Sequence, residues 1–222
     1  KARDEYVAKY RPLVIQSETA WWDANTTGAD EAFERRKQAQ GALVELHSDR
    51  ALFAKLKALK ESGNITDPVL KRELDVMYRS HLPGQSDPQL QKKIIALETE
   101  VEQMFNAHRG EVDGKPLSEN DIRQVLSETK DSSKAEKAWK AYMAVGAGVE
   151  KKLRELVGLR NELARQLGFR NFFAMKLTLQ EIDGTELVRL FDELDTLTKE
   201  PFGALKKDID SAMAARFSIT SD

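Results

Sequence analysis

The sequence predicts an all-α fold. Apolar residues recur at three- and four-residue steps along most of the chain, which is the spacing of one helix face. β-branched runs are sparse, and only six prolines and twelve glycines occur among 222 residues, of which 32% are charged. The absence of a fixed-period repeat weighs against a scaffold of stacked helical repeats.

The composition excludes several classes of function. Lysine and arginine number 35 against 37 acidic residues, so a net charge of -2 gives no electrostatic case for nucleic acid or an anionic membrane. Without cysteine, neither a disulfide framework nor a thiolate zinc site is possible. The longest apolar run, from Ala141 to Val149, is far short of the roughly 20 residues that cross a bilayer. We therefore expect no nucleic-acid and no membrane partner.

The first predicted helix runs from about Arg3 toward Asn25. Pro12 lies inside it and is expected to force a kink or a break. Trp21 and Trp22 are adjacent and therefore point to different faces. We expect one of them in the core and the other against a neighbouring helix or in a cleft.

A long helix, or two helices in line, is predicted over residues 29–62. In its first half, polar residues cover nearly every face of the helix, and Phe33 is almost the only large apolar residue. This composition is typical of a peripheral helix. Asp67-Pro68 and Asp87-Pro88 then start two further helices, with aspartate as the cap and proline in the first turn.

The helix after Asp87 has an apolar seam that would pack lengthwise on another helix. A coiled-coil dimer is the alternative, but the seam has too few heptads to favour it. The seam consists of Leu90, Ile94, Leu97, Val101, Met104 and His108.

Residues 109–117 contain Asp113-Gly114 and predict a turn or small hairpin. Ser118 with Asp121, and Ser133 with Glu136, match the capping box that opens a helix. Small residues at 146 and 148 predict either a close helix crossing or a break.

The stretch from Glu150 to Leu177 is the most informative part of the sequence. Gly168 after its last periodic residue is the usual left-handed cap, and Phe169 can fold back on the final turn. A core face is predicted from Leu153, Leu156, Leu159, Leu163 and Leu167.

This stretch resembles a helix of the angiotensin-converting-enzyme family of zinc peptidases. The version R-N-E-x-A-x-x-x-G-[FY]-x-N-[FY] is similar to bacterial oligoendopeptidases and thimet-type oligopeptidases. The family pattern V-x-L-x-N-x-x-A-R-x-x-G-[YF] is matched by Val157, Leu159, Asn161, Ala164, Arg165, Gly168 and Phe169.

The resemblance continues to the end of the chain. Asp183-Gly184-Thr185 starts a helix whose L-V-R-L-F-D-E-L resembles L-x-R-L-F-x-E-L of the same family. Pro201 is expected to restart a helix, and Arg216-Phe217-Ser218 resembles the family's R-[YF]-G. Animal members close the loop at 109–117 with a disulfide, so the lack of cysteine favours a bacterial relative in the cytoplasm or periplasm.

Zinc peptidases of this kind need H-E-x-x-H, in which two histidines one helical turn apart bind the metal and the glutamate activates water. The chain has three histidines, His47, His81 and His108, and none occurs in that pattern. We expect none of them to bind metal, His108 to be a helix-end residue, and His47 and His81 to be solvated. No nucleophile elbow or phosphate loop is present.

The resemblance implies the N-terminal helical half of a two-lobed, channel-containing zincin peptidase. Residues 1–66 would form lid-like helices and residues 67–222 a helical wall of the substrate channel. The catalytic portion with H-E-x-x-H would follow Asp222 or belong to a companion chain, and would bind the zinc. The implied substrates are oligopeptides, and this chain alone would be inactive.

Four residues are candidates for lining or gating the channel: Trp21, Trp22, Phe33 and Arg36. The alternative for them is ordinary surface and core. The competing hypothesis for the chain is a non-enzymatic all-helical interaction or scaffold domain. That hypothesis predicts covered apolar faces, whereas the peptidase hypothesis predicts a large exposed apolar surface or a bound companion.

Overall fold

The computed structural model describes residues 2–220 and confirms the all-α class. In that range the only strands are a two-stranded hairpin, and a single 3-10 turn joins two of the helices. The elements are α1 (Ala2–Thr27), α2 (Asp30–His47), α3 (Arg50–Ser62), α4 (Pro68–His81), η1 (Pro83–Gln85), α5 (Pro88–Ala107), β1 (Gly110–Val112), β2 (Lys115–Leu117), α6 (Glu119–Glu128), α7 (Ser132–Gln166), α8 (Phe172–Leu179) and α9 (Gly184–Phe217).

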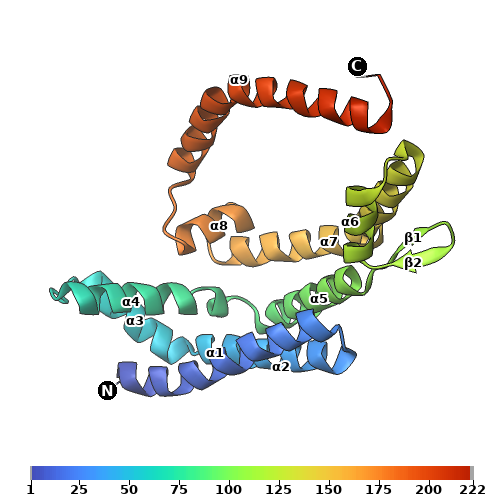
Figure 1. Ribbon diagram of the computed structural model, residues 1–222. Coiled ribbons are helices and arrows are strands. Elements are labelled where there is room, and N and C mark those ends of the chain that lie inside the picture. Colours follow the sequence, from blue (N-terminus) through green and yellow to red (C-terminus); the bar gives the residue numbers. More distant parts are fainter. Residues whose placement is uncertain (1, 221–222) are drawn as a thin grey trace. The chain divides into compact units, whose positions relative to one another are not determined.

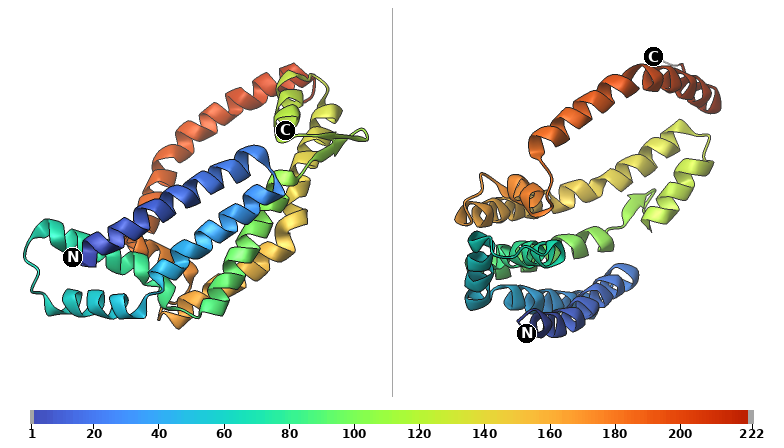
Figure 2. Two further views of the ribbon diagram at one scale, coloured as in Figure 1. Left: turned by 90° about the horizontal axis from the view of Figure 1, so that it is seen from below. Right: turned by 90° about the vertical axis from the view of Figure 1, so that its left-hand side faces the viewer.

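The chain forms two compact units. The first runs to Ala107 and adds Val149–Gln180; the second comprises His108–Gly148 and the chain after Gln180. In the first unit α1 packs along α2, and α2 packs on α5 (Figures 1 and 2). α3 and α4 form a second helical pair in the same unit.

The main core of the first unit lies where α5, the C-terminal part of α7 and α8 meet. Phe169 packs against this core after Gly168, whose φ of +85° confirms the left-handed cap. Leu153 and Val157 are exposed, so the buried face of α7 is narrower than the face that the sequence predicts. The buried residues are Leu90, Ile94, Leu97, Leu156, Leu163, Ala164 and Met175.

The helix starts in the first unit follow the predicted chemistry. Asp67 accepts hydrogen bonds from the amides of Val69 and Leu70, both at 2.9 Å, and Asp87 accepts one from Gln89 at 2.9 Å. Residues 29–62 form two helices because Asp49 caps α3 by accepting from Leu52.

Two prolines lie inside helices rather than ending them. α1 continues through Pro12, so of the predicted kink or break the break is excluded. α9 continues through Pro201, so the predicted restart of a helix there is wrong. The ribbon of α9 bends partway along its length, which is how a helix accommodates the missing N–H of proline (Figure 1).

The second unit has a small core beneath the hairpin. β1 and β2 pair antiparallel around Asp113 and Gly114, both with positive φ, which confirms the predicted hairpin. A Cβ at Gly110 would lie 2.7 Å from the Ile122 side chain and 2.8 Å from the Ala141 carbonyl oxygen, so only glycine fits there. The core consists of Val112, Ile122, Ala138 and Ala141.

Two predictions about α7 differ from the structure. The capping box at Ser118 and Asp121 is present, but α7 is capped by Asp131, which accepts from Ser133 at 2.9 Å. The helix passes through Gly146 and Gly148 without a break, and a Cβ at either position would meet nothing within 4 Å. These glycines therefore mark neither a break nor a close crossing.

α9 has no buried residue. Arg216 near its end donates to the carbonyl oxygens of Ser127 and Thr129, which ties it to the end of α6. None of the helices among residues 2–220 combines the length and the apolar character needed to cross a membrane.

Candidate functional site

The four predicted lining residues lie in α1 and α2. Trp21 and Trp22 are 44% and 63% exposed, so the expectation that one is core is wrong. Phe33 is only 2% exposed and packs with Ala24 and Ala32. Its ring therefore forms the contact between α1 and α2 and lines no surface.

Arg36 is the centre of a polar network between α2 and α5. Its guanidinium forms an ion pair with Glu102, whose carboxylate also accepts a hydrogen bond from Asn25 at 2.9 Å. Burial lowers the pKa of Arg36, and the nearby carboxylates of Glu98 and Glu18 oppose that shift. The side chain therefore stabilises the packing of α2 on α5.

One turn before Glu102 on α5, Glu98 joins three helices. Its Oε1 accepts two hydrogen bonds from Arg160 of α7, at 2.8 and 3.0 Å, and its Oε2 accepts one from Gln40 of α2 at 3.4 Å. Both bonds from the Arg160 guanidinium are charge-assisted and converge on one carboxylate oxygen.

His47 and His81 form an aromatic cluster with Tyr6 and Tyr10. The ring centroids of His47 and His81 are 4.9 Å apart, and Tyr6 lies 5.1 Å from His81. His81 is 0% exposed, and its Nδ1 donates to the Met77 carbonyl oxygen at 2.7 Å. The prediction that His81 is solvated is therefore wrong, and His47 is only partly exposed.

Burial lowers the pKa of both imidazoles and so opposes their protonation. It lowers the pKa of His47 to about 4, with His81 adding to the shift, and it lowers the pKa of His81 against the opposing hydrogen bond to Met77. Burial also raises the pKa of Tyr6. Nothing in the local sequence around His47 marks it as buried, because its partners come from α1 and α4.

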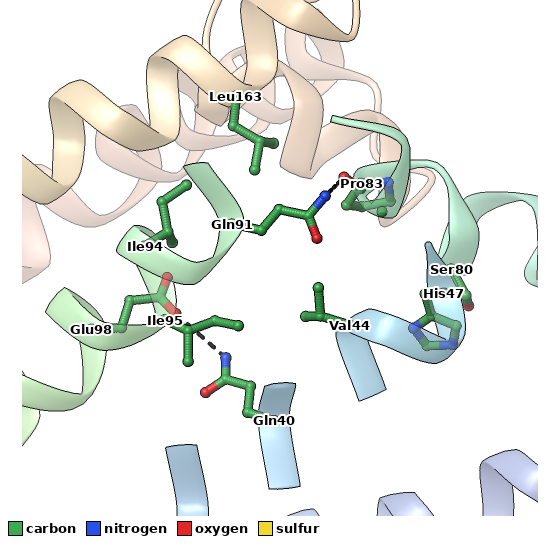
Figure 3. A pocket seen from close by; sticks show the side chains of 11 residues that line it. Gln40, Val44, His47, Ser80, Pro83, Gln91, Ile94, Ile95, Glu98 and Leu163 are labelled. Carbon is green, nitrogen blue, oxygen red and sulfur yellow. Dashed lines mark hydrogen bonds between the residues drawn. The ribbon is translucent and has the colours of Figure 1, made fainter. Parts of the chain in front are cut away.

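A pocket of about 150 Å³ opens beside this cluster, between α2, α4, η1, α5 and α7 (Figure 3). Val44, Ile95 and Leu163 line it with apolar surface, and His47 and Glu98 supply polar groups from two different helices. Every lining residue lies in the first unit. None of these residues forms a pattern in the sequence that predicts a site.

No group of three histidine, cysteine, aspartate or glutamate side chains in the described range could hold a metal ion. His108 lies just after α5, and its Nε2 is 3.3 Å from the Ala141 carbonyl oxygen. The three histidines therefore do not converge on one metal position.

The comparison with known families identifies the family of this chain. The family model described as angiotensin-converting enzyme matches residues 2–201. That range contains the whole pocket, the aromatic cluster and the first half of α9. No curated protein and no solved structure matches the chain.

Proposed function

Because the chain belongs to the angiotensin-converting enzyme family, and is thus a peptidase-related protein, we propose that it forms the lid and one wall of a peptide channel in a zinc metallopeptidase. Residues 1–66 form the lid in this proposal, and residues 67–222 form the wall. The substrates are short peptides, which enter such a channel where folded proteins are excluded.

The zinc in this proposal is bound outside these 222 residues. The family consists of zinc enzymes, and a catalytic zinc needs three converging protein ligands and an open position for water. His47, His81 and His108 do not occur in an H-E-x-x-H pattern. The metal ligands and the glutamate that activates water therefore come from the catalytic portion of the same polypeptide or from a companion chain.

The observation that carries the proposal is the exposed apolar surface of α9. A self-contained interaction domain would cover such residues, because an apolar patch of this length in water is an interface or an aggregation hazard. Nine of its large apolar side chains are at least 42% exposed: Val188, Leu190, Phe191, Leu194, Leu197, Phe202, Leu205, Ile209 and Met213. We assign this surface to contact with the zinc-binding portion.

Trp21, Trp22 and Arg36 remain the candidates for the channel side of the lid. The two indoles offer exposed apolar surface next to polar groups, which suits a peptide with alternating side chains. Arg36 contributes indirectly, because its ion pair with Glu102 holds α2 against α5.

The proposal is tested on the natural gene product, isolated in the presence of protease inhibitors. Mass spectrometry should find sequence with H-E-x-x-H accompanying residues 1–222, and elemental analysis should find zinc in the same fraction. A homogeneous product of these residues alone, with neither zinc nor a zinc-binding companion, would overturn the proposal.

A further inference from the structure

The pocket beside His47 has mainly apolar walls. Val44, Pro83, Ile94, Ile95 and Leu163 line it, and its volume is about 150 Å³. η1 closes it tightly against the end of α2, since a Cβ at Gly84 would lie 2.4 Å from the carbonyl oxygen of His47. A cavity of about this volume accommodates a molecule the size of benzene.

Gln91 presents an unused hydrogen-bond acceptor to this pocket. Its side chain is 5% exposed, and its Nε2 donates to the carbonyl oxygen of Ser86 at 3.2 Å and to its Oγ at 3.0 Å. Because these bonds fix the amide, its oxygen lies on the other side and points into the pocket (Figure 3). No described residue donates to it.

The side-chain donors of the lining are already used. Gln40 donates to Glu98 at 3.4 Å, and the Ser80 hydroxyl donates to the carbonyl oxygen of Val76 at 3.0 Å. His47 is the exception, since its ring nitrogens share one proton and Nε2 is bonded to Tyr6. A ligand must therefore bring its own donors to satisfy Gln91.

Glu98 adds the only ionised side chain that lines the described pocket. Arg160 bonds its Oε1, while Oε2 has only the long contact with Gln40. An ammonium group carries three donors and a positive charge, which suits a pocket whose acceptors are Oε2 of Glu98 and the amide oxygen of Gln91. An anionic ligand would meet a carboxylate and no free side-chain donor other than His47.

We propose that this pocket binds a small aliphatic primary ammonium, with its alkyl chain against the apolar walls and its charged head between Gln91 and Glu98. A free amine and the side chain of a lysine in a peptide share this chemistry. The site lies wholly in the first unit and does not depend on the proposed peptidase role, so either proposal can fail alone.

The test titrates n-butylammonium chloride into the full chain labelled with 15N and follows the Gln91 side-chain amide by NMR. n-Butanol and sodium butyrate have the same chain length and serve as comparators without the positive charge. A short peptide with one lysine, competing with butylammonium, distinguishes the peptide source from the free amine.

Butylammonium should give a saturable shift and bind at least roughly tenfold more tightly than butanol or butyrate. Glu98→Gln should weaken it roughly tenfold, and Val44→Phe should abolish it by filling the pocket. Glu100→Gln is the matched control, because Glu100 lies on the same helix, pairs with Lys152 and does not line the pocket. Equal binding of butanol or butyrate, unchanged affinity in a folded Glu98→Gln variant, or no saturable binding would each overturn the proposal.

Discussion

The hydroxyl oxygen of Tyr6 lies 3.0 Å from Nε2 of His47, and this hydrogen bond joins residues 41 positions apart. It ties the start of α1 to the end of α2, directly beside the fully buried His81. Because burial lowers the pKa of both imidazoles, protonating them opposes the packing of α1 at this place.

We expect acid to destabilise the first unit. The folded pKa of His47 is about 4 against an ordinary value of 6.5, and that of His81 is also lowered. The unfolded chain thus binds more protons below pH 6.5, so stability is fully present above 6.5 and is lost as the pH falls toward 4. Allowing for solvent screening of a part-exposed ring, the loss from His47 between pH 7.5 and 5.0 should be about 1 kcal/mol.

Urea unfolding measures this effect when the signal comes from Trp21 and Trp22 in a Trp139→Phe background, because Trp139 lies in the second unit. His47→Gln should reduce the pH dependence while leaving a group that can bond Tyr6. A free energy of unfolding that stays constant from pH 7.5 to 5.0 would contradict the assignment.

Gly84→Ala should destabilise the same unit by about 1–3 kcal/mol. The added methyl group would collide with backbone atoms of His47 and Ser48, at 2.4 to 2.9 Å, and backbone cannot rotate away as a side chain can. Gly41→Ala, inside α2 with nothing within 4 Å, is the control and should stabilise by about 0.5–1 kcal/mol. Chemical denaturation checks both variants, and equal effects would refute the close contact.

Arg36 and Arg35 form a matched pair for the polar network. Arg36→Met should cost about 2 kcal/mol because it leaves the largely buried Glu102 carboxylate without its cation. Arg35→Met removes only an exposed pair with Asp23 at 3.6 Å and should change stability by less than about 0.5 kcal/mol. Thermal unfolding of the two variants should therefore differ clearly, and similar melting temperatures would show that the Arg36 pair contributes little.

The features that were predicted correctly are those determined by hydrogen bonds or backbone angles within a few residues. Asp67, Asp183 and Gly168 are end signals whose hydrogen bonds or positive φ close within one turn, and all three act as predicted. The hairpin at Asp113-Gly114 follows the same rule.

Features that depend on contacts between residues far apart in the sequence were not predicted. The burial of His81 depends on Tyr6 and His47, and the pocket depends on η1 packing against α2, neither of which leaves a local pattern. At Pro201 the sequence predicts a helix start because a proline inside a helix and one at its start look alike in sequence. The residues around Pro12 and Pro201 are largely exposed, so water can satisfy the freed carbonyl groups and both helices continue.

If the exposed apolar surface of α9 contacts the zinc-binding portion, a substitution on this surface should weaken that association without changing the stability of the chain. Phe191→Ser removes a ring that is 62% exposed and should change the free energy of unfolding by less than about 0.5 kcal/mol. It should nevertheless weaken association with the zinc-binding portion roughly tenfold or more, measured by co-purification. Asp192→Ser, next to it on the same helix, is the control and should leave association unchanged.

The most direct test of the central claim is hydrolysis of a short internally quenched peptide by the chain, with and without the H-E-x-x-H portion and with zinc supplied in both cases. We expect no hydrolysis by the 222 residues alone, and zinc-dependent, chelator-sensitive hydrolysis when the two portions are combined. Hydrolysis by the isolated chain, or a combined sample that remains inactive although both portions are folded and bound, would contradict the account.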